Sequence, residues 1–448
     1  MLRRFAISCF VAMLALPAAG RSRPHYGGTL HVEIEGDPWQ HPDGIARRMV
    51  YDGLTSLGAD GEVQPGLAIS WESDNSTHRW QFRMRQGVHF HDGAPLTSGA
   101  VVASLNASCS SHCPWTEVRA VGSTLVFTNE SAMPNLPALL ASEQFLITLT
   151  VSADVKTPVN AIGTGPFQLT GFNNGVLSLV ANENCWQGRP FTDVVEIRVH
   201  RSIRDQWLDL SVGRADVVEV PAEQLRQAQQ QRLTLVTSSP ASLLALQITG
   251  TVALADPKLR ESIAMAVDRA ALYNVIFQKQ GEVTASLLPQ SLTGYSFLFP
   301  TDRDLNKAHE LRGGQSPALL TLSVDGNGAM QLAAQRIALN LHEAGLNVQV
   351  AGASRQFADL MLRRIPFEGG APAAALESML RNAGEVTAVA EQTPTTLLKR
   401  ERDFLAERKL IPLLLLPKAY AVSGRVRDLK MQMDATPDLS GASLEDER

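Results

Sequence analysis

Histidines and cysteines are the side chains of this sequence whose types and spacing could bind a metal most directly. His89 and His91 lie two residues apart, so on a strand their imidazoles would share one face and could hold a metal ion. No third histidine or suitably spaced carboxylate follows nearby, although protein zinc sites take three or four protein ligands. We therefore expect no metal at this position.

Three cysteines follow the N-terminal segment: Cys109 and Cys113, in the run Ser-Cys-Ser-Ser-His-Cys, and Cys185. A separation of four residues brings two α-carbons within disulfide reach if the chain between them turns helically. Cys109 and Cys113 could thus form a local disulfide in an oxidising compartment. A metal site that also uses His112 and Cys185 is the alternative, and a local disulfide or free thiols is favoured over it.

Common catalytic motifs are missing from the sequence. It has no Gly-x-Ser-x-Gly elbow, no His-Glu-x-x-His pair and no phosphate-binding Gly-x-x-x-x-Gly-Lys-Ser/Thr loop. Gly163-Thr-Gly165 and Gly326-Asn-Gly328 lack the third glycine of a dinucleotide-binding fingerprint. We predict that the protein is not an enzyme and uses no cofactor. A secreted hydrolase with scattered catalytic residues is the alternative from another class.

Composition describes a globular protein with more than one domain. The chain has 448 residues, of which 44% are hydrophobic and 19% are charged. At about 150 residues per domain, a chain of this length is expected to have roughly three domains. The formal net charge of −5 provides no general basic field for phosphate backbones, so we exclude nucleic acid as a partner.

The first twenty residues have the order of a secretory signal peptide. Arg3 and Arg4 precede an apolar run from Phe5 to Leu16, and small residues follow from Pro17 to Gly20. A bilayer core needs roughly twenty apolar residues, so this run is too short to be an anchor. We expect residues 1–20 to be removed by cleavage near Ala19 or Gly20 and the mature protein to be periplasmic.

Beyond the signal, strand patterns alternate with helix patterns, which favours α/β domains. A helix opened by Thr97 and Ser98 is expected over 96–105, and the helix expected at 203–212 carries Trp207, Leu208, Leu210 and Val212 on one buried face. Further helices are expected at 256–277 and 329–344. Strands are predicted at 29–35, 79–88, 124–128, 167–170, 177–181, 194–199, 243–248, 319–324, 346–350 and 410–416.

Several of these segments carry motifs in a recognisable order. Between Trp80 and Leu105 they include Phe82-Arg-Met-Arg85, Phe90-His-Asp-Gly93 and Pro95-Leu-Thr97, and Gly163-Thr-Gly-Pro-Phe167 follows. Together they resemble the extracytoplasmic solute-binding protein family that includes dipeptide-, oligopeptide- and nickel-binding components of ABC importers. The resemblance extends over roughly residues 28 to 440. Further matching segments are Tyr51-Asp-Gly-Leu-Thr55, Pro65-Gly-Leu-Ala68, Asp256 to Arg269, the segment from Gln331 to Val350, and Tyr420-Ala-Val422.

This resemblance implies an α/β fold of two lobes around a cleft, with an extra domain inserted in the first lobe. Lobe one would comprise residues 24–45, 163–240 and 420–448, the inserted domain residues 46–162, and lobe two residues 241–419. Family members bind by hinge closure, and linkers near Ser239-Pro240 and Lys418-Ala419 would be the hinges. The implied partners are a small-molecule or peptide ligand and an ABC membrane permease, with the binding protein a monomer. A family scaffold that has lost ligand binding is a further alternative.

By position, the first-lobe rim of the cleft would be formed by Gly36, Asp37, Trp39 and Gln40, although Trp39 could instead anchor the first strand in the core. Candidate contacts from lobe two are Gln247, Arg363, Arg364 and Glu368. An arginine facing the cleft would favour a carboxylate or phosphate group.

In the peptide-binding relatives, a segment resembling Trp-x-x-Asp-Tyr-x-x-Pro presents an aspartate to the ligand's ammonium. The corresponding stretch here, 361–373, contains neither aspartate nor tryptophan. Glu368 could substitute only by reaching in from a Gly-rich loop. We therefore predict that the protein does not hold a peptide's amino terminus through a buried lobe-two carboxylate.

Overall fold

The structure is a computed structural model. It describes residues 25–39, 44–58, 61–109, 113–149, 161–250, 252–295, 298–314, 319–324, 326, 328–351, 358–367, 372–385, 393–432 and 435–445. The expected signal peptide and the candidate ligand contacts Gln40 and Glu368 lie outside these residues. Within the described part of the chain, no helix has the length and apolar character needed to cross a membrane.

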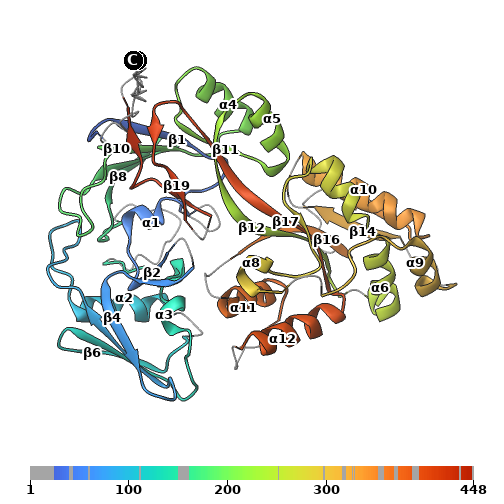
Figure 1. The fold of residues 1–448 in the computed structure, drawn as a ribbon, viewed down its shortest axis with the longest axis horizontal. Coiled ribbons are helices and arrows are strands. Elements are labelled where there is room, and N and C mark those ends of the chain that lie inside the picture. Colours follow the sequence, from blue (N-terminus) through green and yellow to red (C-terminus); the bar gives the residue numbers. More distant parts are fainter. Residues whose placement is uncertain are drawn as a thin grey trace, which may run out of the picture.

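One mixed sheet runs through most of the molecule (Figure 1). Its two long central strands, β12 (Thr234–Ile248) and β17 (Leu410–Val422), pair with each other antiparallel. On one side of them follow β11 (Val217–Val220), β1 (Thr29–Glu33), β10 (Val194–Arg198), β9 (Val176–Ala181) and β8 (Phe167–Asn173). On the other side follow β16 (Leu360–Pro366), β14 (Leu320–Val324) and β15 (Val348–Ala351), while β13 (Glu282–Val283) pairs with β17.

The first core surrounds β1, whose Leu30 and Val32 are fully buried, as the alternation of its sequence predicts. Chain from the C-terminal end completes this core, since Tyr420 and Leu444 pack in the same cluster. Four short strands form two small pairs there: β18 (Val426–Arg427) with β21 (Ser443–Leu444), and β19 (Lys430–Met431) with β20 (Pro437–Asp438). Helices α4 (Ile203–Ser211) and α5 (Leu225–Gln230) lie beside it, with η2 (Ala222–Gln224) leading into α5.

A second unit has its own core and a four-stranded sheet in the order β4 (Ala68–Ser73), β5 (Arg79–Met84), β7 (Thr124–Thr128), β6 (Glu117–Val121). Aromatic rings fill this core, with Phe82 and Trp115 both edge-on to Phe127. Helix α2 (Ser98–Ser108) begins at Thr97, whose hydroxyl accepts a hydrogen bond from the Ala100 amide at 3.1 Å, as its sequence predicts. The remaining elements are β2 (Thr55–Leu57), β3 (Val63–Pro65), α3 (Leu136–Leu139) and η1 (Glu143–Phe145).

Cys109 and Cys113 form a disulfide at the end of α2, with their α-carbons 5.2 Å apart. Cys185 is a buried free thiol, and burial raises its pKa. In the structure the two nearby cysteines are therefore joined to each other and not to Cys185.

The second unit meets the first at α1 (Arg47–Val50), whose Met49 and Val50 pack into the core around β1. Two glycines approach this helix closely: a β-carbon on Gly163 would lie 2.0 Å from the Val50 carbonyl oxygen. We therefore propose that the boundary between lobe one and the inserted domain lies near residues 51–53, just before Leu54 joins the second core.

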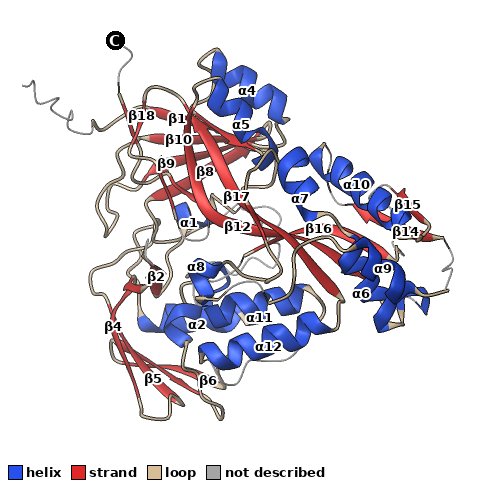
Figure 2. Cartoon of the chain, turned by 45° about the vertical axis from the view of Figure 1, so that its right-hand side comes forward, coloured by secondary structure: helices blue, strands red, loops and turns tan. Residues whose placement is uncertain are grey.

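The third region packs helices on both faces of the sheet (Figure 2). Leu244 and Leu246 of β12 face α6 (Pro257–Ala266), α9 (Leu305–Arg312) and α10 (Ala329–Glu343). Leu243 and Ala245 face α11 (Pro372–Asn382) and α12 (Pro394–Ala406). The remaining elements are η3 (Val252–Leu254), α7 (Arg269–Ala271), η4 (Leu272–Ile276) and α8 (Gln290–Thr293).

Two sequence expectations about helices are wrong. The continuous helix expected at 256–277 breaks at Val267 and Asp268, where the Asp268 side chain caps a new turn by accepting from the Ala271 amide. Leu208 of α4 and Val212, the residue that follows α4, are 56% and 54% exposed, while the polar Gln206 and Asp209 of α4 are buried. A hydrogen bond explains that orientation, because the Glu219 main-chain N–H donates to the Gln206 side-chain oxygen at 2.8 Å.

Candidate functional site

The two central strands connect the lobes and are irregular where the lobes meet. Pro240 of β12 lies opposite Pro417 of β17, and the register shifts on both sides of Pro240. Proline has no N–H to donate, so the hydrogen-bond ladder is interrupted there. The irregularity falls beside the linkers that the sequence predicts as hinges.

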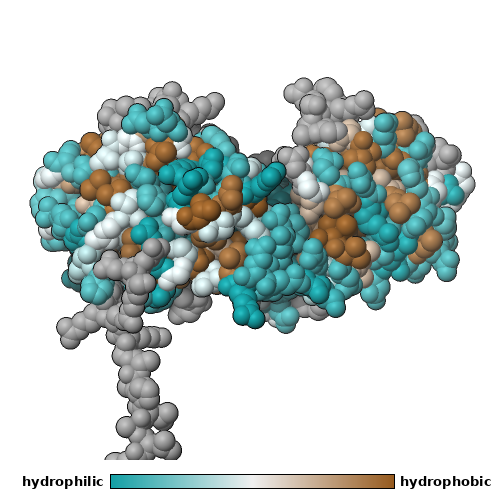
Figure 3. Space-filling view, turned by 90° about the horizontal axis from the view of Figure 1, so that it is seen from above, coloured by the Kyte–Doolittle hydropathy of each residue, from teal (hydrophilic) through white to brown (hydrophobic). Residues whose placement is uncertain are grey.

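A cavity of about 680 Å³ lies beside this irregular stretch of β12 and β17, which is called the β12/β17 crossing below. Its size falls in the range of small-molecule sites. Seen from above, the surface narrows between its two halves and is mostly hydrophilic, with scattered hydrophobic patches (Figure 3). The walls come from both lobes and from the strand segments that join them. They include Glu35, Gly36, Ile203 and residues 219–224 on one side, Gly326, Gly328, Met330, Arg364, Pro366 and Phe367 on the other, and Ala241, Ser242, Pro417, Lys418 and Ala419 between them.

The lobe-one wall is acidic. Glu35 follows β1 and Glu219 lies in β11, its parallel neighbour, so both lie at the carboxyl ends of adjacent parallel strands. Glu219 accepts the Glu35 amide at 2.6 Å, which fixes the loop that leads to Gly36. Glu223 contributes a third carboxylate to the same wall.

The lobe-two wall contains an arginine because of strand alternation. Arg363 and Arg364 are consecutive in β16, so their side chains leave opposite faces of the sheet. Arg364 lines the cavity. Arg363 points to the other face, where it donates to the Gln247 side-chain oxygen at 2.7 Å and to the Asn382 carbonyl at 3.2 Å.

The structure therefore brings only some of the candidate ligand contacts together. Gly36 and Arg364 line the cavity, whereas Gln247 and Arg363 bind each other outside it. Asp37 accepts a hydrogen bond from the Trp39 amide at 2.8 Å and so stabilises the turn after β1. Trp39 is buried in the lobe-one core, 6.1 Å from the Tyr51 ring, which is the anchoring role considered as its alternative.

Sequence reasoning missed Glu35, Glu219 and Glu223 as cavity residues. A signal for two of them was present, because ligands of α/β sheets bind at the carboxyl ends of parallel strands. Using it requires knowing that β1 and β11 are neighbours, although their paired residues Val32 and Val217 are far apart in the sequence.

Main-chain hydrogen bonds hold both ring nitrogens of His91. Its Nδ1 accepts from the Gly163 amide at 3.3 Å and its Nε2 bonds the Gly165 carbonyl at 3.0 Å, which together require the neutral ring with the proton on Nε2. Burial lowers its pKa and favours that neutral form. Both nitrogens of His91 thus hold the two glycines against α1.

Residues 62–365, more than half of the chain, match the family described as bacterial extracellular solute-binding proteins, family 5 Middle. The chain belongs to this family. A probable di/tripeptide-binding protein of Pseudomonas aeruginosa is 24% identical over 414 residues, covering 78% of this chain and 76% of its own. The dipeptide-binding protein of Escherichia coli is 23% identical over 275 residues, which cover 52% of this chain and 51% of that protein.

Solved structures show the same fold. The periplasmic binding protein DppA of Helicobacter pylori, in complex with the peptide STSA, aligns with a TM-score of 0.80 at 18% identity, over 94% of this chain and 99% of that one. NikA of Staphylococcus aureus, in complex with Ni(L-His)2, aligns with a TM-score of 0.79 at 18% identity, over 93% and 100%. The two-lobe α/β architecture is therefore that of the periplasmic binding proteins. Because the identities are low, these likenesses carry the fold and leave the ligand open.

Proposed function

We propose that this protein is the extracytoplasmic substrate-binding component of an ABC importer, which captures a small solute between its lobes and delivers it to a membrane permease. The observation that carries the proposal is the cavity at the β12/β17 crossing, whose walls come from both lobes. A ligand in it can contact both walls at once only when the lobes approach, so binding favours the closed form. Export through residues 1–20 and action as a monomer without turnover belong to the same proposal.

The charges on the cavity walls define the ligand further. Glu35, Glu219 and Glu223 make the lobe-one wall acidic, whereas Arg364 of lobe two and Lys418 beside the proposed hinge are cationic lining residues. We infer a solute whose cationic group faces lobe one and whose carboxylate or phosphate faces Arg364. This is the reverse of an ammonium held by a lobe-two carboxylate, which the sequence of residues 361–373 already disfavours.

Calorimetry and thermal-shift screening of the mature protein test the assignment, since a ligand that binds the folded state raises its stability. The library should hold amino acids, di- to pentapeptides, sugars, metal ions and small phosphates. For a carboxylate or phosphate ligand, Arg364→Ala should weaken binding by roughly tenfold or more, because a charge-assisted hydrogen bond is lost. Glu223→Gln should weaken the binding of cationic ligands in the same way.

Lys307→Gln is the matched control for these variants. Lys307 is in lobe two on α9 and pairs with Glu310 at 3.0 Å on the surface, so removing its charge should leave binding unchanged. Hydrolysis of peptides or esters by the purified protein would contradict the proposed transport function and favour an enzyme. Absence of any ligand across the library would favour a scaffold that has lost binding.

Free peptides provide a separate test of ligand polarity. Micromolar binding of di- to pentapeptides, abolished both by blocking the peptide amine and by Glu368→Gln, would overturn the proposed orientation. We expect neither effect, because a buried ammonium needs a partner carboxylate and the relatives' aspartate is missing here.

A further inference from the structure

A second cavity lies away from the interlobe cleft, where the inserted domain meets the C-terminal strands of lobe one. Its volume is about 360 Å³, which lies within the range of small-ligand pockets. Separate parts of the chain form it, among them α1 with the segment that leads into β2, the region of Ala141 and Leu146, the loop that contains Gln187, and the β19–β20 pair. Met49, Leu146 and Leu439 supply apolar wall.

The carboxylate of Asp52 faces this cavity with one oxygen left over. Its Oδ2 accepts two hydrogen bonds, from the Thr164 hydroxyl at 2.7 Å and from the Trp186 indole N–H at 2.8 Å. No described residue donates to Oδ1. Burial raises the pKa of this carboxyl, against the opposing effect of those two hydrogen bonds.

The position of Asp52 is fixed by its surroundings. Its main-chain carbonyl accepts the Ile147 amide at 2.9 Å, and Trp186 is covered by the Arg85 guanidinium at 4.4 Å from the ring. A side chain held this firmly loses little freedom when a ligand binds it, which favours binding.

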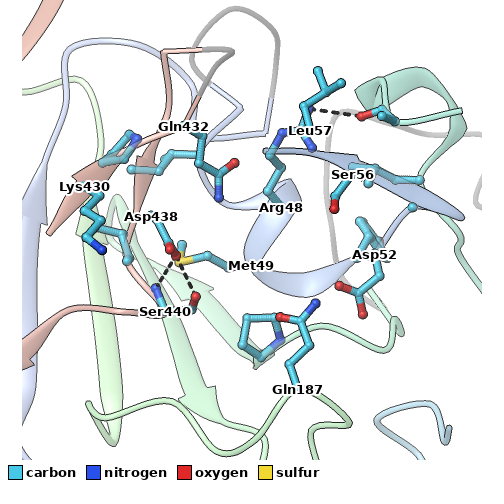
Figure 4. A pocket seen from close by; sticks show the side chains of 18 of the residues that line it. Arg48, Met49, Asp52, Ser56, Leu57, Gln187, Lys430, Gln432, Asp438 and Ser440 are labelled. Carbon is cyan, nitrogen blue, oxygen red and sulfur yellow. Dashed lines mark hydrogen bonds between the residues drawn. The ribbon is translucent and has the colours of Figure 1, made fainter. Parts of the chain in front are cut away.

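Polar groups line the opposite side of the cavity. The close view shows Asp52 and Ser56 on one side, Lys430, Asp438 and Ser440 on the other, and Met49 between them (Figure 4). Asp438 accepts from the Ser440 amide at 3.1 Å and from its hydroxyl at 2.6 Å, both at Oδ1. Lys430 is the cross-strand neighbour of Asp438, yet no described residue forms an ion pair with its ammonium.

We propose that this cavity is a second binding site, for a small solute that carries a protonated primary amine, with the amine hydrogen-bonded to Oδ1 of Asp52. An ammonium supplies the donor that Oδ1 lacks and is a charge-assisted partner for a carboxylate. The apolar wall at Met49 and Leu439 would cover a short carbon chain. Lys430 at the far side would add an interaction for solutes that also carry a carboxylate, as free amino acids do.

The second cavity has its own lining residues, although Ala435, which lies between β19 and β20, lines the proposed transport cleft. No residue lines both cavities. Occupation would join the inserted domain to the C-terminal strands of lobe one, so the ligand should stabilise this junction whether or not the cleft is filled.

Thermal shift and calorimetry with three probes of similar size test the proposal: n-butylamine, L-alanine and butyrate, each compared with potassium chloride at the same ionic strength. The two amines should stabilise the protein and butyrate should not. Asp52→Asn keeps an acceptor for Thr164 and Trp186 but removes the charge, and it should weaken amine binding by roughly tenfold or more. Lys430→Gln should weaken L-alanine while leaving n-butylamine unchanged if amino acids are the preferred solutes.

Ser56→Phe keeps the proposal testable if Asp52→Asn fails to fold. Ser56 is an exposed residue of β2 that lines the cavity, so a phenyl ring there should obstruct binding without touching the hydrogen bonds of Asp52. The cleft variants Arg364→Ala and Glu223→Gln affect cationic solutes only in the cleft, so the amine binding that Asp52→Asn removes should persist in both. The proposal is overturned if no amine binds the wild type, if binding survives both Asp52→Asn and Ser56→Phe, or if the cleft variants abolish it.

Discussion

Buried charged side chains in this protein depend on main-chain partners as much as on opposite charges. Arg269 is buried and donates to the Pro412 carbonyl at 2.9 Å, and burial lowers its pKa to about 10. Glu401 is fully buried in lobe two, where it accepts the Leu287 amide at 2.5 Å and the Tyr295 hydroxyl at 2.7 Å. Such groups hold loops in place, and their charge states couple folding to pH.

Glu401 gives a prediction with a defined sign. Burial raises its pKa above the ordinary value of 4.5, so the folded state binds a proton that the unfolded state releases. Its contribution to stability is therefore fully present below about pH 4.5 and is lost as the pH rises through the raised folded pKa. Glu401→Gln should remove this part of the pH dependence, measured by urea unfolding at several pH values.

Tyr295→Phe completes the test of that pair. It removes one donor to a buried carboxylate and should cost about 1–3 kcal/mol in the free energy of unfolding. If the wild type and Glu401→Gln show the same pH dependence of stability, the pKa of Glu401 does not differ between the folded and the unfolded state.

Among the candidate ligand contacts, Gly36 lines the cavity, as its position in the family resemblance suggests, but the sequence did not distinguish Arg363 from Arg364. Choosing between two consecutive arginines requires the phase of the strand that carries them, and β16 has no clear alternation in its sequence, Leu-Met-Leu-Arg-Arg-Ile-Pro. The hydrogen bond between Arg363 and Gln247 could not be predicted either, because the two residues lie 116 positions apart in the sequence.

Elements with clean local patterns were predictable, and those shaped by distant partners were not. Strand 124–128 matches β7 residue for residue, and helix 329–344 matches α10 to within one residue. In contrast, β12 and β17 are much longer than the expected strands 243–248 and 410–416. Their extensions pair with each other, so the evidence for them lies on another part of the chain.

The C-terminal segment illustrates this long-range dependence. Arg425 forms two hydrogen bonds with the buried Asp216 carboxylate, each at 2.6 Å, and a third with the Thr29 carbonyl at 3.0 Å. The Asp216 carboxylate also accepts the His31 amide at 3.0 Å. One carboxylate thus joins the C-terminal segment to β1 and β11, in agreement with the proposal that residues 420–448 complete lobe one.

We predict that Asp216→Asn destabilises lobe one by roughly 2–3 kcal/mol, below the usual cost of breaking a buried pair because Arg425 is partly exposed. The pKa of Asp216 is lowered from its ordinary 3.8, mainly by Arg425 against the effect of burial. Its contribution is therefore present above about pH 3.8 and lost as the pH falls through the lower folded pKa. Chemical unfolding near neutral pH and near pH 3 measures both effects.

Arg427→Gln is the control for this prediction, because Arg427 pairs with Glu445 at 2.9 Å on the surface and should contribute ~0.5 kcal/mol or less. Equal losses for Asp216→Asn and Arg427→Gln would contradict the assigned role of Asp216.

On the scale of the whole molecule, one sheet passes through both lobes, and the proposed hinge coincides with a local irregularity within it. The two lobes are joined at β12 and β17, where paired prolines interrupt the hydrogen bonds. Helices α4 and α10 begin at opposite walls of the cavity, at Ile203 and near Met330. A rotation at the proline pair therefore changes the separation of these two helices while each lobe keeps its own core.

Spin labels on these helices can report that motion. Leu208 of α4 and Leu332 of α10 are 56% and 54% exposed, so Leu208→Cys and Leu332→Cys accept labels without disturbing a core. The natural thiol Cys185 is buried, and its raised pKa keeps it unreactive at neutral pH. Addition of a solute that binds the cleft should shorten and narrow the distance distribution between the labels, because contacts to both walls exist together only in the closed form. A second label pair within lobe two, Leu319→Cys with Leu332→Cys, should not change. An unchanged α4–α10 distance in protein that calorimetry shows to be saturated would mean that the cleft binds without closing, and the hinge assigned to Pro240 and Pro417 would have to be abandoned.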